Sequence, residues 1–99
     1  MKIEWTPLAP LRHSEHAAYI ARDNSKAAER WVDRLFDKVA RLEMLPDSGR
    51  MAPEVQRRDI REIVFGAYRI IYRREAERVA ILTVRHSRQK WAAGEVSDG

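Results

Sequence analysis

The chain has 99 residues, of which 44% are hydrophobic and 34% charged, with a formal net charge of +4. This composition is typical of one folded domain and argues against disorder, because so apolar a chain can offset its ordering entropy by burial. It has no cysteine and no stretch apolar enough to span a membrane, so disulfides, a cysteine nucleophile and a membrane partner are excluded, and a cytoplasmic protein is expected.

The first predicted elements are a short strand and a helix. Residues 2–5 alternate polar and apolar side chains, which indicates a strand. Thr6 and Pro7 then favour the start of a helix, because threonine caps a helix and proline suits its first position. This helix is expected to run to about Arg22 and to stop at the turn-forming residues 23–25.

A second and longer helix is the clearest element of the sequence. Ser25 is its predicted N-cap, and Pro46 ends it. Its apolar positions recur at spacings of three and four: Ala28, Trp31, Val32, Leu35, Phe36, Val39, Leu42 and Leu45. Its opposite, solvent side carries Arg30, Arg34, Asp37, Lys38 and Arg41. The short connection predicts that the two helices form an antiparallel hairpin.

The remainder of the chain predicts a small sheet. Residues 46–50 have the composition of a turn, and residues 51–59, which show no period, are expected to be a loop. Residues 60–65, 67–73 and 78–86 read as three strands of an antiparallel meander. The fold class is therefore α+β: an N-terminal strand, an antiparallel helix hairpin and a three-stranded meander. Residues 1–91 form the single domain, followed by a flexible C-terminal tail over residues 92–99.

Arginine dominates the basic residues of the predicted sheet. The chain has fifteen arginines and four lysines, and residues 51–99 carry ten basic and seven acidic side chains. In the middle strand, Arg69 and Arg73 alternate with Tyr68 and Tyr72, so the two pairs face opposite sides. The helices can cover one side only, so the arginine face is expected either to remain solvated or to bind an acidic partner.

The last predicted strand runs into a cluster made of Arg85, His86, Arg88 and Trp91. Such residues could bind a phosphate backbone and stack a base, and a histidine could transfer a proton near neutral pH. A structural or partner-contacting role is the other interpretation. The chain has no glycine-rich phosphate loop, paired-carboxylate signature or serine elbow, and no cofactor is expected.

His13 and His16 lie three residues apart on the first predicted helix. A metal pair is one interpretation of this spacing. However, no third ligand is near in sequence, so partly buried histidines satisfied by neighbouring groups are favoured and no metal site is expected.

Several segments, in their order and spacing, carry a resemblance to a known family. They are Trp5-Thr6-Pro7 with Ala9, Tyr19-Ile20, Ala28 with the apolar helix stripe, Leu45-Pro46-Asp47-Ser48-Gly49-Arg50, Ile60-Arg61-Glu62-Ile63, Tyr68-Arg69-Ile70-Ile71-Tyr72-Arg73 and Val84-Arg85-His86. Over residues 3–88 the chain resembles the ParE/RelE superfamily of toxins from type II toxin–antitoxin modules. The resemblance implies the α+β fold given above.

The RelE-like branch of that superfamily cleaves messenger RNA on the ribosome. By this resemblance Arg61 and Arg69 would stabilise the phosphate charge and His86 would act as acid or base. However, the two strand lysines of that branch fall on Ile60 and Glu62, and no tyrosine follows Trp91. The ribosome and messenger RNA are therefore the alternative partners.

The turn at residues 46–50 and the strand at residues 61–63 look more like the ParE branch. That resemblance implies a toxin that poisons DNA gyrase without catalysis of its own, and an acidic, ParD-like antitoxin that neutralises it. The residues expected to bind antitoxin or target are Arg61, Arg69, Arg73, Arg85, His86, Arg88 and Trp91. A family member that has lost toxicity and binds only its antitoxin is a third hypothesis.

Overall fold

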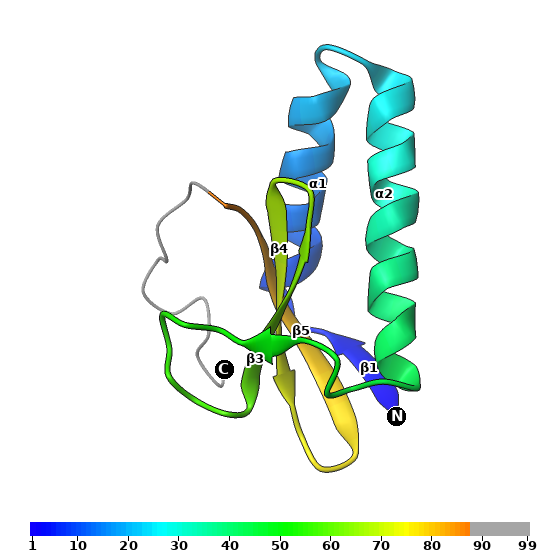
Figure 1. Ribbon diagram of the computed structural model, residues 1–99. Coiled ribbons are helices and arrows are strands. Elements are labelled where there is room, and N and C mark those ends of the chain that lie inside the picture. Colours follow the sequence, from blue (N-terminus) through cyan, green and yellow to red (C-terminus); the bar gives the residue numbers. More distant parts are fainter. Residues whose placement is uncertain (88–99) are drawn as a thin grey trace.

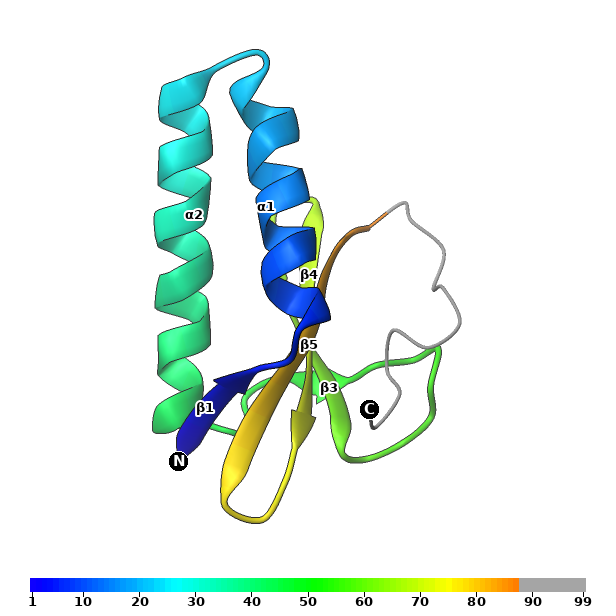
Figure 2. The same ribbon diagram turned by 180° about the vertical axis from the view of Figure 1, so that it is seen from behind.

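The computed structural model describes residues 1–87, so the predictions for Arg88, Trp91 and residues 92–99 lie outside it. Figures 1 and 2 show two antiparallel helices packed against one side of a sheet. This arrangement confirms the α+β fold with its N-terminal strand, helix hairpin and antiparallel strands. Within residues 1–87, no helix has the length and apolar character that crossing a membrane requires.

The elements follow one another in a simple order. They are β1 (Lys2–Trp5), α1 (Leu8–Ala21), α2 (Ser25–Ala40), the short 3-10 helix η1 (Arg41–Glu43), β2 (Arg50–Met51), β3 (Ile60–Phe65), β4 (Tyr68–Arg74) and β5 (Arg78–His86). The helix predicted to continue to Pro46 therefore ends as α2 and η1. Asn24, rather than the predicted Ser25, caps α2, because its side chain accepts a hydrogen bond of 3.0 Å from the Ala27 amide.

The five strands form one sheet in the order β1-β5-β4-β3-β2. The predicted antiparallel meander is β3, β4 and β5. The N-terminal strand β1 pairs in parallel with β5, so the two ends of the domain meet in the sheet. The segment predicted to be a turn and loop contains the two-residue strand β2, which pairs with Arg61 and Glu62 of β3.

A bulge interrupts the pairing of β4 with β5. Ile71 pairs with Thr83, whereas the next residue, Tyr72, pairs with Ile81, so Leu82 is an extra residue in β5. Leu82 packs with Ile71 on one face of the sheet, and Ile81 packs with Tyr72 on the other. The alternation of β5 side chains between the two faces therefore shifts by one residue at Leu82.

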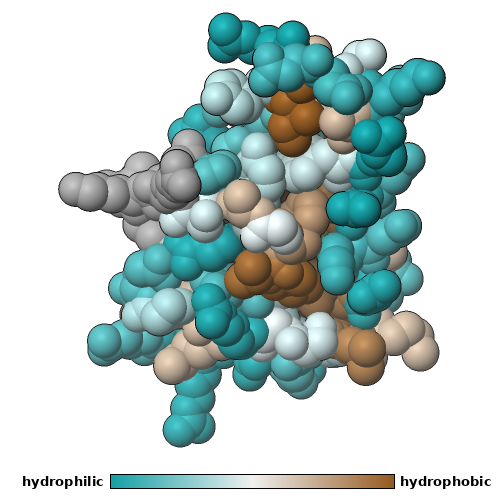
Figure 3. All heavy atoms as spheres, turned by 45° about the horizontal axis from the view of Figure 1, so that its top comes forward, coloured by the Kyte–Doolittle hydropathy of each residue, from teal (hydrophilic) through white to brown (hydrophobic). Residues whose placement is uncertain are grey.

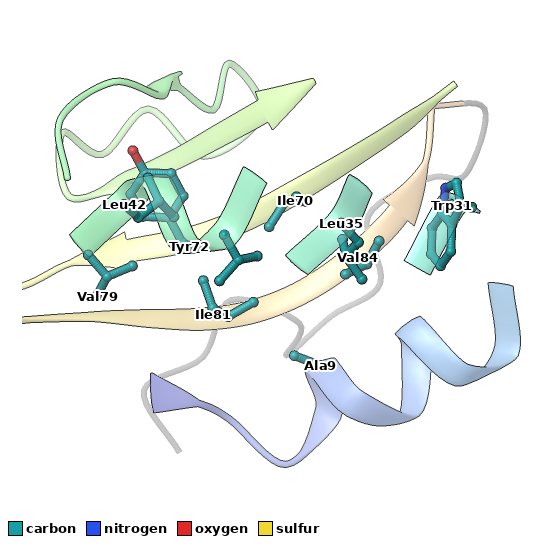
Figure 4. Packing of buried hydrophobic residues seen from close by; sticks show 10 residues of the cluster. Ala9, Trp31, Leu35, Leu42, Ile70, Tyr72, Val79, Ile81 and Val84 are labelled. Carbon is teal, nitrogen blue, oxygen red and sulfur yellow. The ribbon is translucent and has the colours of Figure 1, made fainter. Parts of the chain in front are cut away.

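The face of the sheet that the helices cover, here called the helix face, carries the main core (Figure 4). Side chains from both helices meet those of β4 and β5 there: Ala9, Trp31, Leu35, Val39, Leu42, Ile70, Tyr72, Val79, Ile81 and Val84. The Tyr72 hydroxyl accepts a hydrogen bond of 2.9 Å from the Gly49 amide and donates one of 2.8 Å to the Pro46 carbonyl. A Cβ at Gly49 would lie 2.6 Å from that hydroxyl, so glycine is needed for this close approach.

The opposite face is covered by residues 52–59, here called the strap, which runs between β2 and β3 (Figures 1 and 2). Beneath it lies a second cluster of buried apolar side chains: Ala52, Ile60, Ile71, Ala80 and Leu82, with Val55 packed against them. The sequence predicted an open arginine face here. That prediction is wrong, because a segment that lacks any hydrophobic period folds back over the sheet.

Candidate functional site

A groove separates α2 from the β3–β4 hairpin on the helix face. Two hollows of about 790 and 480 Å³ share Lys38, Arg41 and Val64 and so form one continuous channel. The channel begins beside Ile20 and reaches Arg50 of β2 at its other end. This channel is here called the basic groove.

The α2 side of the basic groove is a row of cations. Arg30, Arg34, Lys38 and Arg41 are spaced by four, four and three residues, which places them on one side of the helix. Within residues 1–87 none of the four makes an ion pair. Asp37 is the one acidic side chain of this helical wall in the described chain. The wall therefore offers a strong positive field to an incoming ligand.

The other side of the basic groove is apolar and has an open strand edge. Ile63 and Phe65 line it from the helix face, and Val64, which is 49% exposed, lines it from the strand edge between them. Because β2 pairs with Arg61 and Glu62 alone, the outer edge of β3 from Ile63 to Phe65 has no strand partner in the described structure. Figure 3 shows hydrophobic surface flanked by hydrophilic surface across this side of the molecule. Open strand edges and apolar grooves are both places where a peptide segment binds.

Two of the predicted site residues lie on the helix face. Arg61 pairs across the sheet with Tyr72, and its guanidinium donates a hydrogen bond of 2.8 Å to the Gly49 carbonyl. His86 pairs with Tyr68, and their rings meet edge to face with centroids 5.2 Å apart. Along β3, Arg61 lies four residues from Phe65, which is the residue that pairs with Tyr68. Arg61 is therefore separated from the Tyr68 and His86 pair by about 13 Å of strand.

Three other predicted site residues point to the strap face of the sheet. Arg69 and Arg85 are register partners on the strap face and are 8% and 2% exposed. The Arg69 guanidinium is bonded to Glu54 at 2.7 Å and to Glu62 at 3.0 Å. The hydrogen bond to Glu54 and the nearby charge of Glu62 raise the pKa of Arg69. Arg73 pairs with Glu75 at 3.4 Å.

The predicted residues are therefore not assembled into one site. The expectation that a partner would lie over Arg61, Arg69 and Arg73 together is wrong in its geometry, because Arg61 points to the helix face and the other two point to the strap face. The residues proposed for nuclease chemistry, Arg61, Arg69 and His86, are likewise divided between the two faces. A shared phosphate would not reach all three.

His13 and His16 lie where α1 packs against α2. The His16 Nε2 atom is 2.8 Å from the Val84 carbonyl oxygen, and the His13 ring stacks on Trp31 with centroids 5.9 Å apart. Burial lowers the pKa of both histidines, so both are neutral at neutral pH. In residues 1–87 no group of three potential metal-ligating side chains occurs around them or elsewhere. Both side chains thus belong to the aromatic part of the core.

The basic groove was visible in the sequence without being recognised as a site. The cations of α2 recur at helical spacing, but a charged helix face is more often simply solvated. What distinguishes this face is the neighbouring edge of β3, and only the tertiary structure brings the two together. Arg50 was assigned to a turn, although it stands at the end of the basic groove.

Comparisons with known proteins agree with this fold. Residues 3–91 match the family described as ParE toxin of type II toxin-antitoxin system, parDE. The protein named "Putative toxin Y4kP" from Sinorhizobium fredii is 39% identical over 92 residues, covering 91% of this chain and 92% of that protein. A solved structure described as a chromosomal ParDE TA system from P. aeruginosa superposes with a TM-score of 0.71 at 17% identity. That match covers 87% of this chain and 95% of the other, and it supports the fold.

Proposed function

The chain belongs to the ParE family of toxins from type II toxin–antitoxin systems, and from this premise we propose that it arrests growth by poisoning DNA gyrase and is neutralised by an acidic antitoxin in the basic groove. In this proposal the chain acts by binding proteins and performs no chemistry itself. It works in the cytoplasm, where gyrase is found.

The observation that carries the proposal is the basic groove. Four cations of α2 and η1 have no ion-pair partner within residues 1–87, and they face an apolar strand edge 63–65. An antitoxin segment with carboxylates on one side and apolar residues on the other would match both walls. By contrast, Arg61, Arg69 and His86 are separated by the sheet, which supports binding over nuclease catalysis.

Contact between the antitoxin and Arg69, Arg73 or Arg85 stays a prediction. Their side chains point to the strap face, and Arg69 is bonded to Glu54 of the strap, so contact with Arg69 requires the strap to move. Arg61 is closer to the proposed binding surface, since its backbone acceptors at Asp47 and Gly49 lie in the turn that leads to Arg50.

The gyrase part of the proposal is tested with purified proteins. We expect the chain to inhibit DNA supercoiling by gyrase and to accumulate gyrase-linked DNA breaks, with topoisomerase I as the control enzyme. Transcripts from cells that express the chain should show no new ends within codons. Unaffected supercoiling together with new transcript ends would instead establish the nuclease branch, and the absence of any growth defect would establish a non-toxic binder.

The antitoxin part is tested with charge reversals in the basic groove. The paired change Arg34→Glu and Lys38→Glu should weaken binding of the cognate antitoxin by about 100-fold, because each reversal places like charges together. Arg22→Glu at the end of α1 lies outside the basic groove and serves as the matched control. Equal affinities of the two variants in calorimetry would refute this placement of the antitoxin.

A further inference from the structure

The strand β1 forms one edge of the sheet, and the basic groove lies at the other. The strand order places β1 next to β5 alone, whereas the apolar wall of the basic groove belongs to β3, three strands away. Figure 2 shows β1 in the foreground, at the margin of the domain. Within residues 1–87, β1 therefore has an outer edge that no strand covers.

The backbone of β1 has hydrogen-bonding groups directed to that outer edge. The Thr6 amide donates to the Ile81 carbonyl at 2.9 Å, which fixes the phase of the ladder between β1 and β5. Because successive residues of a strand direct their amide and carbonyl groups to opposite edges, Ile3 and Trp5 direct theirs away from β5. No backbone hydrogen bond within residues 1–87 joins these outward groups to another segment. They are available to a further strand.

The side chains of β1 carry one charge of each sign on the strap face. Ile3 and Trp5 pack against the main core, so Lys2 and Glu4 point to the opposite face. The Lys2 Nζ atom is 3.1 Å from the Glu4 carboxylate, and Arg78 of β5 also donates to Glu4. Lysine on an edge strand usually discourages pairing with another sheet, but a lysine beside a glutamate is complementary to its own rotated copy.

We propose that two copies of this chain pair through β1 as a symmetric dimer, with the strands antiparallel and Ile3 opposite the partner's Ile3. The two sheets then continue into each other across a two-fold axis. Each Ile3 amide donates to the partner's Ile3 carbonyl, and each Trp5 amide donates to the partner's Met1 carbonyl. Lys2 lies opposite the partner's Glu4 in a non-hydrogen-bonded pair, where facing side chains are closest.

The charges of β1 and the proline that follows it select this register. A two-fold axis centred on Lys2 or on Glu4 would place like charges directly opposite each other, which destabilises an antiparallel pair. An axis centred on Trp5 would place Ile3 opposite the partner's Pro7, which has no amide hydrogen to donate. Of these registers, the one centred on Ile3 alone pairs opposite charges and uses both outward amides of β1.

Apolar side chains on the helix side of this edge support the same pairing. The Phe36 and Trp5 ring centroids are 5.5 Å apart, and Phe36 is nevertheless 48% exposed. The Met1 ammonium donates to the Glu43 carbonyl of η1 at 3.1 Å, while the Met1 residue is 37% exposed. In the proposed register the partner's Trp5 lies opposite Met1, so the exposed apolar surface at each end of the strand pair gains an apolar neighbour.

The proposed dimer is independent of the toxin activity and of the antitoxin site. The basic groove lies between α2 and the β3–β4 hairpin, at the other edge of the sheet, so it stays open in each copy. A dimer would present two basic grooves related by the two-fold axis and would bind two antitoxin segments. Because short strands bury little surface, the pairing should be weak and reversible, in the micromolar range.

Charge reversal at β1 tests the dimer without any other partner. Sedimentation velocity of the full chain from about 5 to about 500 µM should show a reversible equilibrium between monomer and dimer. Lys2→Glu and Glu4→Lys each place like charges opposite each other and should each weaken the dimer by about tenfold. An equimolar mixture of the two variants should restore association, because every charge of one variant then faces the opposite charge of the other.

A disulfide gives a second readout that depends on the register, since the natural chain has no cysteine. Ile3→Cys places two thiols at a hydrogen-bonded pair on the two-fold axis, where Cα atoms about 5.5 Å apart suit a disulfide. Mild oxidation should yield a covalent dimer. The matched control is Arg22→Cys, at the exposed residue that follows α1, and it should yield about tenfold less.

A chain that stays monomeric over the whole concentration range would overturn the proposal. So would a dimer that neither reversal weakens, a mixture that associates no better than its components, or a dimer that Arg34→Glu with Lys38→Glu abolishes. If Glu4→Lys, which loses its bond to Arg78, does not fold, the disulfide yields decide the question. Gyrase inhibition and antitoxin binding are measured separately, so failure of the pairing and failure of the proposed function give different results.

Discussion

The two faces of the sheet are closed by different physical means. The helix face is covered by two helices and buries a large cluster rich in aromatic and branched side chains. The strap face is covered by eight residues, a small aliphatic cluster and paired charges. Burial supplies a non-directional stabilisation that resists local change, whereas paired charges depend on each partner staying in place. The strap face should therefore be the weaker and more switchable one.

Neighbouring isoleucines in β4 give the most direct test of this contrast. Ile70 and Ile71 are both 0% exposed, but they point to the helix face and the strap face respectively. We expect Ile70→Ala to lower the free energy of unfolding by about 4 kcal/mol and Ile71→Ala by about 2.5 kcal/mol, because the small cluster can collapse around the cavity. Urea unfolding followed by tryptophan fluorescence measures both, and equal losses would contradict the contrast.

The buried carboxylate of the strap face should have the next largest effect. Glu62→Gln removes a buried negative charge to which both Arg50 and Arg69 donate, which should cost about 3 kcal/mol of stability. The matched control is Glu15→Gln, which breaks an exposed pair with Arg12 and should change stability by less than about 0.5 kcal/mol. A loss below 1 kcal/mol for Glu62→Gln, on the scale of surface ion pairs, would show that the strap face does not depend on its charges.

A hydrogen bond on the helix face provides a third and smaller test. Tyr72→Phe removes the hydroxyl that joins Gly49 to Pro46 and leaves the ring in place. We expect a loss of about 1.5 kcal/mol, because the Gly49 amide is left without its acceptor in a buried site. The turn before Arg50 should also lose protection from amide exchange. Unchanged exchange would show that burial alone positions this turn.

The smallest effect expected is a change of folding stability with pH, which comes from two histidines on the helix face. Burial lowers the pKa of His13 and His16 from 6.5 in the folded chain, so the unfolded chain takes up protons first as the pH falls. Stability is therefore fully present above about pH 6.5 and decreases as the pH falls from there through the lowered folded values, by less than about 1 kcal/mol per group after solvent screening. The groups that act on His16 include Glu15, which opposes the shift, and Arg12 and His86, which add to it.

The measurement is the urea midpoint at pH 7.5 and pH 5.5. Glu4 and Asp59 have lowered pKa values and titrate below this window, so they do not contribute. The double variant His13→Phe and His16→Gln should remove most of the difference between the two pH values. A wild-type midpoint that rises on acidification would reverse the expected sign.

Local patterns predicted the elements of this fold because those patterns are strong. The apolar spacing of α2 and the alternation of Tyr68, Arg69, Ile70 and Ile71 are local properties and appear as expected. The parallel pairing of β1 with β5 joins residues more than seventy positions apart, and nothing in residues 2–5 specifies that partner. The strand β2 was missed because two residues cannot show a period.

The candidate site was harder to predict because faces depend on register. In β3 the order Ile60, Arg61, Glu62, Ile63 does not alternate, so the sequence alone could not show that Arg61 points toward Tyr72. The buried position of Glu62 is equally hidden, because a glutamate usually indicates solvent. The strap has the composition of an exposed loop, and only Val55 and Glu54 tie its centre to the sheet in the contacts described above.

The bulge at Leu82 determines which face of the sheet each later residue of β5 points to. If β5 kept Leu82 but alternated regularly through it, without the bulge, Val84 and His86 would exchange sides with Arg85. A guanidinium would then enter the aromatic core beside Trp31, and His16 would lose the neighbour to which it is bonded. Deletion of Leu82 should leave every later residue of β5 on its present face, because Thr83 alone would then oppose Ile71, and it should remove only the contacts that Leu82 makes in the strap-face cluster.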